Sequence, residues 1–243
     1  MKKSMENNKN VTLIYSKVII PKFPLKMSPN SKLLREYKMK LGNLSEIQWE
    51  ASIGLMLGDA SLQTQNKEKT YRMKFEWGDK NKLYAEHIHS LFNEWILSPP
   101  HKKPRVNING NIVISWGFQT FSHNAFNPLS KLFLFNKQKG IINNLIEKYL
   151  TPRGLAYWFM DDGGKLDYNK HSLNKGLVLN THSFSKEEVK MMTFELSNKF
   201  NLITDMRLNK NKYIIIIKSE SYKNFINLTN SYIIPSMRYK LHT

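Results

Sequence analysis

The sequence contains no cysteine among its 243 residues. This absence excludes disulfide bonds, zinc sites built on thiolates and catalysis by a thiol nucleophile. Seven histidines are present, but His87 and His89, which share a predicted helix, are two positions apart and point in different directions. The sequence also lacks the Gly-x-x-x-x-Gly-Lys-Ser/Thr loop of nucleotide hydrolases. It therefore favours neither a zinc nuclease nor a nucleotide-hydrolysing enzyme.

Acidic residues are scarce relative to basic ones. Asp and Glu number 19 against 37 Lys and Arg, which gives a formal net charge of +18. A charge of this size favours a polyanionic partner, and nucleic acid is the first candidate. A membrane surface is the competing partner, but the basic residues are spread over the whole chain instead of lying along one amphipathic helix. We expect a nucleic-acid partner and no membrane.

Long apolar runs are also absent, since no stretch reaches the roughly 18 continuous apolar residues of a spanning helix. Residues 1–29 carry Lys, Asn and three prolines around one short apolar patch, so we interpret them as an N-terminal arm without a core of its own. The arm has no Arg, whereas mitochondrial transit peptides are usually rich in it. The length of the chain allows one domain or two small ones.

Two stretches combine an apolar helical pattern with an acidic end. Residues 51–61 read ASIGLMLGDAS and contain Asp59, and residues 154–164 read GLAYWFMDDGG and contain Asp162. A capping-box pattern precedes the first stretch and a Thr-Pro pair precedes the second, so both are predicted helices. A helix that is apolar nearly all round must be buried, and the simplest burial is one copy against the other.

The acidic ends break a local rule. A carboxylate at a helix C-terminus faces the negative end of the helix dipole, at a cost of about 0.3 to 1 kcal/mol. Two such carboxylates at matching positions indicate a site that needs both close together. Paired carboxylates suit a shared divalent cation such as Mg²⁺, which prefers oxygen ligands. The alternative is a pair of core helices whose terminal acids merely face solvent.

The predicted elements occur in the same order twice. Each acidic helix is followed by a strand pair, a helix, a strand pair and a further helix, and Asn109-Gly110 marks one hairpin turn. Residues 80–97 are a predicted helix, and residues 122–135 are predicted to be helical with a break at Pro128. The predicted fold class is α+β, with two pseudo-symmetric αββαββα halves. The halves are residues 30–150 and 151–243.

The duplication can be tested by spacing. Because 103 residues separate the two acids, other residues of a duplicated site should recur at nearly this spacing. The same spacing sets Gly54 against Tyr157 and Gly58 against Asp161, so that glycines meet bulkier partners. A lysine pair alone carries little weight among so many lysines. Two pairs meet the condition: Lys139 with Lys240, 101 residues apart, and Glu76 with Asn180, 104 residues apart.

The runs Ser52–Ala60 and Leu155–Gly163 resemble the two motifs of a single-chain LAGLIDADG homing endonuclease. The flanking runs Tyr149–Pro152 and Trp158–Lys165 strengthen the resemblance, which covers about residue 30 to the C-terminus. It implies two sheets that form a saddle over double-stranded DNA, with the helix ends above the minor groove. It also implies a monomer that makes a double-strand break in a long asymmetric site and supports intron mobility.

The resemblance implies roles for the paired residues. Asp59 and Asp162 would hold Mg²⁺, for which Mn²⁺ would substitute. Lys139 and Lys240 would be catalytic lysines near the scissile phosphates, and Glu76 and Asn180 would be further catalytic polar groups. Residues 71–77 alternate, which places Arg72, Lys74 and Glu76 on one polar strand face. The candidate DNA-binding residues are Gln63, Gln65, Lys67, Arg72, Lys74, Lys102, Lys103, Arg105, Lys165, Tyr168 and Lys170.

Two other functions fit the same pattern. An RNA maturase would use this fold to bind intron RNA and help the intron splice, and a non-catalytic DNA binder would show no metal-dependent chemistry. Retention of both acids and both lysines favours a nuclease, because a pure binder has no reason to keep a like-charged acid pair. The resemblance, together with 31 Lys against 6 Arg, a skew typical of AT-rich genes, favours a mitochondrial location.

Overall fold

The computed structural model describes residue 28 and residues 31–166 and 175–242. The first half contains α1 (Lys32–Lys40), α2 (Glu46–Leu57), β1 (Ser61–Gln63), β2 (Arg72–Gly78), α3 (Lys82–Leu91), β3 (His101–Val106), β4 (Ile112–Gln119), α4 (Asn127–Phe133), β5 (Leu134–Phe135), β6 (Gln138–Lys139) and α5 (Leu145–Tyr149). The second half contains α6 (Pro152–Asp162), β7 (Gly163–Lys165), β8 (Leu177–Leu179), α7 (Lys186–Phe200), β9 (Thr204–Asn209), β10 (Lys212–Ile217) and α8 (Tyr222–Thr229). Short 3₁₀ helices are η1 (Asp79–Asn81), η2 (Asn93–Trp95), η3 (Asn124–Phe126), η4 (Ser219–Ser221) and η5 (Pro235–Lys240).

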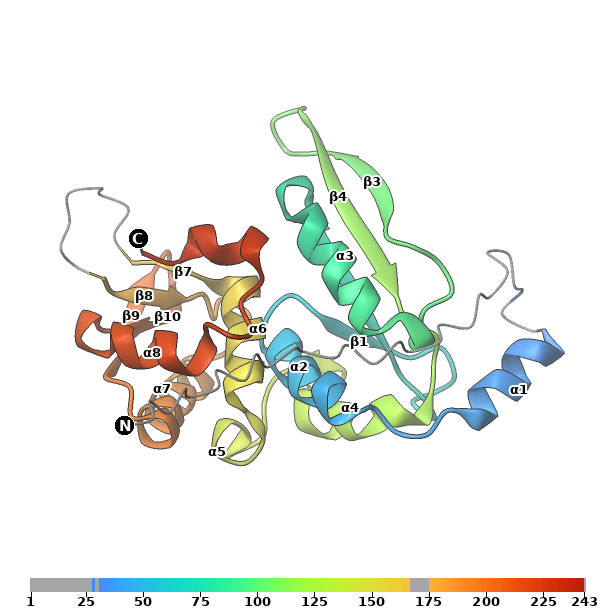
Figure 1. Cartoon of the computed structure of the whole chain (residues 1–243), viewed down its shortest axis with the longest axis horizontal. Helices are drawn as coiled ribbons and strands as arrows, with labels where there is room; N and C mark the ends of the chain where they lie inside the picture. The colour runs from blue at the N-terminus through green and yellow to red at the C-terminus, as the bar shows by residue number, and fades with distance from the viewer. Residues whose placement is uncertain (1–27, 29–30, 167–174, 243) are drawn as a thin grey trace, which may run out of the picture.

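Helices α2 and α6 begin at the expected start signals. The Ser45 hydroxyl accepts the Gln48 N–H, and the Gln48 side chain accepts the Ser45 N–H, which completes a capping box. Thr151 accepts the Gly154 N–H at 3.2 Å, directly before Pro152. Most residues of both helices are buried, and the two helices pack against each other at the centre of the molecule (Figure 1). This confirms the predicted pairing of the two acidic helices.

The contact between α2 and α6, called here the helix seam, depends on glycine. A Cβ added to Gly54 would lie 2.0 Å from the carbonyl oxygen of Gly154, so the two backbones touch at this crossing. The spacing set Gly54 against Tyr157, but its nearest neighbour across the helix seam is Gly154, so the helices approach closest where both carry glycine. The predicted contact of Gly58 with Asp161 is confirmed, since an added Cβ would lie 2.4 Å from the Asp161 carboxylate.

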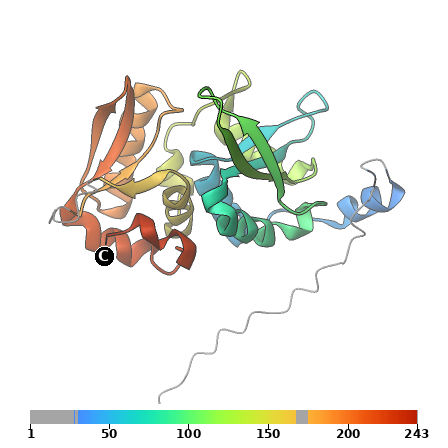
Figure 2. The same cartoon turned by 90° about the horizontal axis from the view of Figure 1, so that it is seen from above.

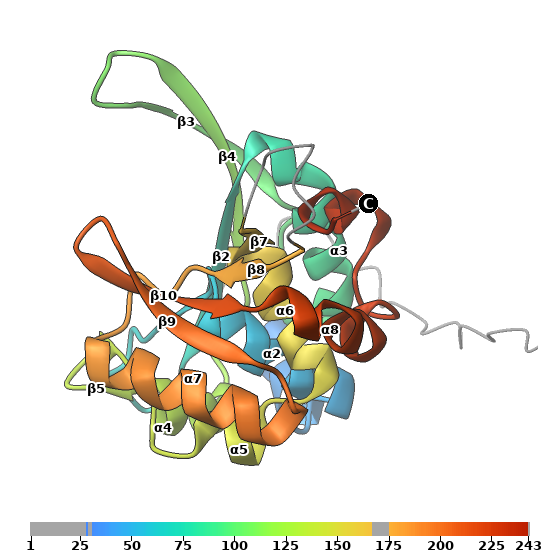
Figure 3. The same ribbon diagram turned by 90° about the vertical axis from the view of Figure 1, so that its left-hand side faces the viewer.

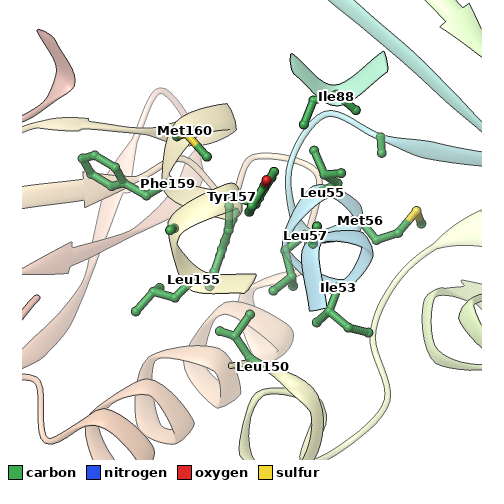
Figure 4. Packing of buried hydrophobic residues seen from close by; sticks show 14 of the residues in the cluster. Ile53, Leu55, Met56, Leu57, Ile88, Leu150, Leu155, Tyr157, Phe159 and Met160 are labelled. Atoms are coloured by element: carbon green, nitrogen blue, oxygen red, sulfur yellow. The ribbon is translucent and has the colours of Figure 1, made fainter. Parts of the chain in front are cut away.

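Tyr157 fills the remaining space at the helix seam. It points from α6 toward α2 in Figure 4, and its hydroxyl lies 2.8 Å from Nε2 of His87 in α3. At the other end of the helix seam Arg153 pairs with Glu50 at 2.8 Å. These two residues are 103 positions apart, so the duplication places opposite charges at matching positions.

The two main sheets share one topology. Their strand orders are β1-β2-β4-β3 and β7-β8-β10-β9, and all neighbouring strands are antiparallel. The sheets stand on opposite sides of the helix seam in Figure 2. The β3–β4 and β9–β10 hairpins extend toward the same side of the molecule, away from α3 and α8 (Figure 3). The α+β fold with duplicated antiparallel sheets is therefore confirmed.

Several predicted elements are shorter than expected. The helix predicted over 80–97 is α3 followed by η2, and the hairpin loop spans 107–111, with Gly110 at φ +79°. Pro128 does not break a helix but occupies the first turn of α4, where its missing N–H costs nothing. The N-terminal arm, apart from Ser28, lies outside the described residues.

Candidate active site and nucleic-acid surface

Lys139 and Lys240 occupy matching places at the ends of the two seam helices. The Lys139 ammonium donates to the carbonyl oxygens of Gly58 and Ala60, and that of Lys240 donates to those of Met160 and Asp161 at 2.6 and 2.7 Å. These carbonyls lie at helix C-termini, where unpaired acceptors and the negative dipole end favour a cation. Both lysines therefore offset the cost of placing acids there.

Burial lowers the pKa of both lysine side chains, and the nearby carboxylates act in the opposite direction. Each lysine is half-buried. The carboxylates partly offset the effect of burial on the lysine pKa values, so the charges of the two lysines and of the acids depend on one another. The structure thus brings together the lysine pair and the acid pair that the spacing predicted.

Asp59 and Asp162 lie close enough to influence each other. Loss of water, followed by the Asp59 charge, raises the pKa of Asp162 to about 7, while both lysines oppose the shift. Asp59 is open to solvent, yet the surrounding protein still displaces enough water to raise the pKa of its carboxyl. The pair is therefore short of positive charge.

Sequence reasoning missed Asp161, a buried carboxylate next to Asp162. Its two oxygens accept the Asp59 N–H and the Trp77 indole N–H, each at 3.0 Å. Burial, and then the Asp59 charge, raise its pKa well above the usual value. The spacing had set Asp161 against Gly58, but only packing shows that its carboxylate accepts from Asp59 and Trp77 of the first half.

Sequence reasoning also missed Lys80 in η1. It lines a cavity of about 260 Å³ together with Asp162, Lys165, Asn180 and Lys240. Three lysines thus line a space together with Asp161 and Asp162, although Lys80 comes from the other half of the chain. No local pattern distinguishes Lys80 from the many surface lysines, so the sequence held no signal for it.

Glu76 and Asn180 occupy equivalent places but differ in their partners. Continuing the strand registers places Asp59 opposite Glu76 and Asp162 opposite Asn180. Asn180 donates from its backbone and its side chain to the Asp162 carbonyl oxygen, at 3.0 and 2.9 Å. Glu76 instead accepts a hydrogen bond from the Ser115 hydroxyl at 2.8 Å and another from the Lys103 ammonium at 3.1 Å. Asn180 therefore fixes its acid directly, whereas the Glu76 side chain is held by its own sheet.

The polar face predicted for β2 is confirmed. Met73, Phe75 and Trp77 are buried, and the residues between them are only half-buried. Strand registers place the residues paired with this polar face on the same side of the first sheet. This surface, called here the basic platform, comprises Gln63, Arg72, Lys74, Glu76, His101, Lys103, Arg105, Ser115 and Gln119.

Some predicted DNA-binding residues lie elsewhere. Lys102 pairs with Trp116 and so lies on the opposite face of the sheet from Lys103 and Arg105, which separates it from the basic platform. Gln65 and Lys67 lie in the loop after β1, and Lys165 lies at the cavity beside Asp162. Tyr168 and Lys170 lie outside the described residues.

The chemistry of the acid pair fits a divalent cation. Both groups are oxygen donors, and the nearest lysines donate to carbonyl oxygens instead of to the carboxylates. Among residues 31–166 and 175–242, no group of three or more His, Cys, Asp or Glu residues could hold a metal alone. Asp59 and Asp162 would therefore supply only part of a coordination sphere.

Within the described part of the chain, no helix is long and apolar enough to cross a membrane. Residues 49–225 match the model of the LAGLIDADG DNA endonuclease family, and the chain belongs to that family. This membership confirms the family predicted from the two motifs and their flanking runs, and it places the chain among DNA endonucleases.

Individual relatives support this assignment. The chain is 48% identical to the "Probable intron-encoded endonuclease 1" of Wickerhamomyces canadensis, over 94% of this chain and 98% of that protein. It is also 48% identical to the homing endonuclease I-WcaI, whose structure was solved bound to its DNA recognition sequence. That structure superposes with a TM-score of 0.85 over 89% of this chain and 95% of I-WcaI. The cytochrome b mRNA maturase bI2 of Debaryomyces hansenii is 32% identical over 79% of this chain and 72% of the maturase.

Proposed function

We propose that this protein is a site-specific homing endonuclease that makes a double-strand break in a long, asymmetric DNA target by metal-dependent phosphodiester hydrolysis. One observation carries the proposal: Asp59 and Asp162 meet at the joined ends of α2 and α6, and each helix end binds one lysine. A pure binding protein gains nothing from two carboxylates at adjoining helix ends, where loss of water and then the Asp59 charge raise the pKa of Asp162.

The chain positions its reacting groups through rigid elements. Asp59 follows the buried helix α2, Asp162 is the last residue of the buried helix α6, and Asn180 holds the Asp162 main chain. Such fixed placement lowers the entropy cost of bringing reactants together. Lys139 and Lys240 would place positive charge near the phosphate as negative charge develops during bond cleavage.

Mg²⁺, or Mn²⁺ in its place, would be held by Asp59 and Asp162 and would supply Lewis-acid activation of water and stabilisation of the leaving oxygen. The raised pKa of Asp162 supports this assignment, because a cation would supply the positive charge that the pair lacks. The incomplete ligand set leaves coordination positions for water and for phosphate oxygens of the DNA.

The basic platform would contact one half of the DNA site. Arg72, Lys74, Lys103 and Arg105 share this face, so phosphate contacts and base contacts could come from one surface. The second sheet has the same topology but different residues, which suits a target with two unlike halves. One chain carries both halves of the acid pair, and we therefore expect a monomer.

A maturase activity on intron RNA is the second candidate, because relatives of this chain include the bI2 maturase of Debaryomyces hansenii. Splicing support would need the basic surface but not the acid pair. The naming of other relatives as intron-encoded endonucleases supports a role in intron mobility and, with the AT-rich composition, a mitochondrial location.

The test is cleavage of randomised duplex DNA with Mg²⁺, followed by sequencing of the cut ends, with the I-WcaI recognition sequence as a first defined substrate. Asp59→Asn and Asp162→Asn should each abolish double-strand cleavage and leave DNA affinity within a few-fold, because only the reacting groups change. Normal cleavage by both variants would contradict the site assignment. Tight binding without cleavage by the unaltered protein would favour the non-catalytic DNA-binder alternative.

A further inference from the structure

Asp161 and Gly58 are duplicates that meet across the helix seam. They are 103 residues apart, the same spacing that separates Asp59 from Asp162. A Cβ on Gly58 would lie 2.4 to 2.8 Å from three atoms of the Asp161 side chain, so that side chain fills the space above the glycine. Only one of the two positions can carry a carboxylate. The site is therefore asymmetric at this point.

Among the described residues, the hydrogen-bond donors to the Asp161 carboxylate belong to the first half. Oδ2 accepts the Asp59 N–H and Oδ1 accepts the Trp77 indole N–H, both at 3.0 Å, while the Tyr84 phenol of α3 also faces the group. A residue of α6 thus has its side chain inserted into the first half. The Asp59 N–H and the Trp77 indole N–H hold the carboxylate in place, and the carboxylate in turn holds the backbone of Asp59.

In the described structure the Asp59 N–H makes no hydrogen bond within its own turn. At the end of α2 the Gly58 N–H bonds to the Gly54 carbonyl, and the Ala60 N–H bonds to that of Leu55. The amide between them donates across the helix seam to Asp161. The last turn of α2 therefore closes on a partner from the other half of the chain.

Asp162 is held differently. Helix α6 continues through it, the Gly163 N–H bonds back to Phe159, and Asn180 binds the Asp162 carbonyl. The second acid thus needs no group from the first half to fix its backbone, whereas the first acid depends on Asp161.

We infer that Asp161 is a positioning residue for Asp59, which holds that backbone across the helix seam without itself contacting the DNA or its phosphates. This inference rests on the proposed function, because it assigns Asp161 a purpose only where Asp59 acts. It also makes the two acids unequal in a way that the motif alone does not show.

The test variant is Asp161→Asn, which keeps the size of the side chain but leaves one oxygen for two N–H donors. Adding Trp77→Phe removes the competing indole donor, so the remaining oxygen can accept the Asp59 N–H again. The matched control is Asp79→Asn, because Asp79 also accepts an indole N–H, from Trp116 at 2.7 Å, but on the exposed surface.

Amide hydrogen exchange followed by NMR reads the contact without any cleavage. Exchange at Asp59 should accelerate at least tenfold in Asp161→Asn, with Asp162 unchanged, and should slow again in the double variant. Equal exchange at Asp59 in the wild type and in Asp161→Asn would overturn the inference. This readout does not depend on activity, so it is separate from a failure of the proposed function, in which the wild type itself would not cut.

Single-turnover cleavage then measures the consequence. A misplacement of about 1 Å costs on the order of 100-fold in rate, so Asp161→Asn should be about 10- to 100-fold slower, with metal-free DNA affinity within threefold. Ca²⁺ should also strengthen DNA binding less in this variant than in the wild type, a readout free of catalysis. A rate equal to that of Asp79→Asn, or a loss of metal-free DNA binding, would show that Asp161 serves the fold alone.

Discussion

Replacing Asp162 by Asn should stabilise the metal-free protein by an amount that grows from about pH 4 and levels off above about pH 7. The Asp162 pKa is about 7 in the folded chain against an ordinary value of 3.8, so folding retains a proton that the unfolded chain has lost. Stability therefore falls as pH rises from about 4 to 7, and the loss is complete above 7. Asn carries no charge and escapes this loss.

The size of the effect follows from the shift in pKa. About three pH units at 1.36 kcal/mol each give about 4 kcal/mol as an upper limit, which screening of this partly exposed carboxyl reduces. For a chain of this length each kcal/mol changes Tm by about 2–4 °C.

The assay is thermal or urea denaturation of both proteins in EDTA, at steps from pH 4.5 to pH 8.5. The stability difference should be small at the acid end and should grow until about pH 7. Mg²⁺ should then raise the stability of the wild type at pH 8 more than that of the variant. A difference that stays constant with pH, or a variant that is less stable at pH 8, would refute the reasoning.

Three further results are expected. Lys74→Gln should weaken DNA binding and lower the salt slope by about 0.9 per lost phosphate contact, whereas Lys102→Gln on the opposite face should leave the slope unchanged; equal slopes for both would place the DNA elsewhere. Gly54→Ala should cost about 1–3 kcal/mol or prevent folding, because its Cβ would meet the Gly154 carbonyl, and an unaltered Tm would contradict the packing. Sedimentation with and without DNA should show one chain per asymmetric site, and two chains on a palindrome would contradict the single-chain assignment.

Local patterns predicted the elements on which the site is built. The starts of α2 and α6 depend on hydrogen bonds within four residues, so their caps are visible in the sequence. The alternation in β2 has the period of an extended strand, and burial follows it closely. Spacing between duplicated residues made Lys139 and Lys240 candidates, and the family resemblance gave the pair its weight; the structure brings both to the site because each half repeats the same chain path.

Features that depend on contacts between distant segments were not predictable in the same way. Asp161 accepts from residues 102 and 84 positions away, so its role follows from how α6 packs and not from its neighbours. The face of Lys102 depends on where β3 begins, and one residue of shift reverses it. Pro128 would break a helix that began well before it, but it is tolerated in the first turn of one. Here the 3₁₀ turn η3 ends at Phe126 and α4 begins at Asn127, so Pro128 lies in the first turn.

The ion pair between Glu50 and Arg153 bears on the history of the chain and on its re-engineering. In a symmetric ancestor made of two identical subunits, a two-fold axis would bring equivalent positions together, Glu against Glu or Arg against Arg. Opposite charges at these duplicated positions can therefore have been selected only after the two copies were fused and free to diverge. A chimaera that joins one half of this protein to a half from a relative must carry a matching charge at position 50 or 153, or it places a like-charged or unpaired side chain at the helix seam.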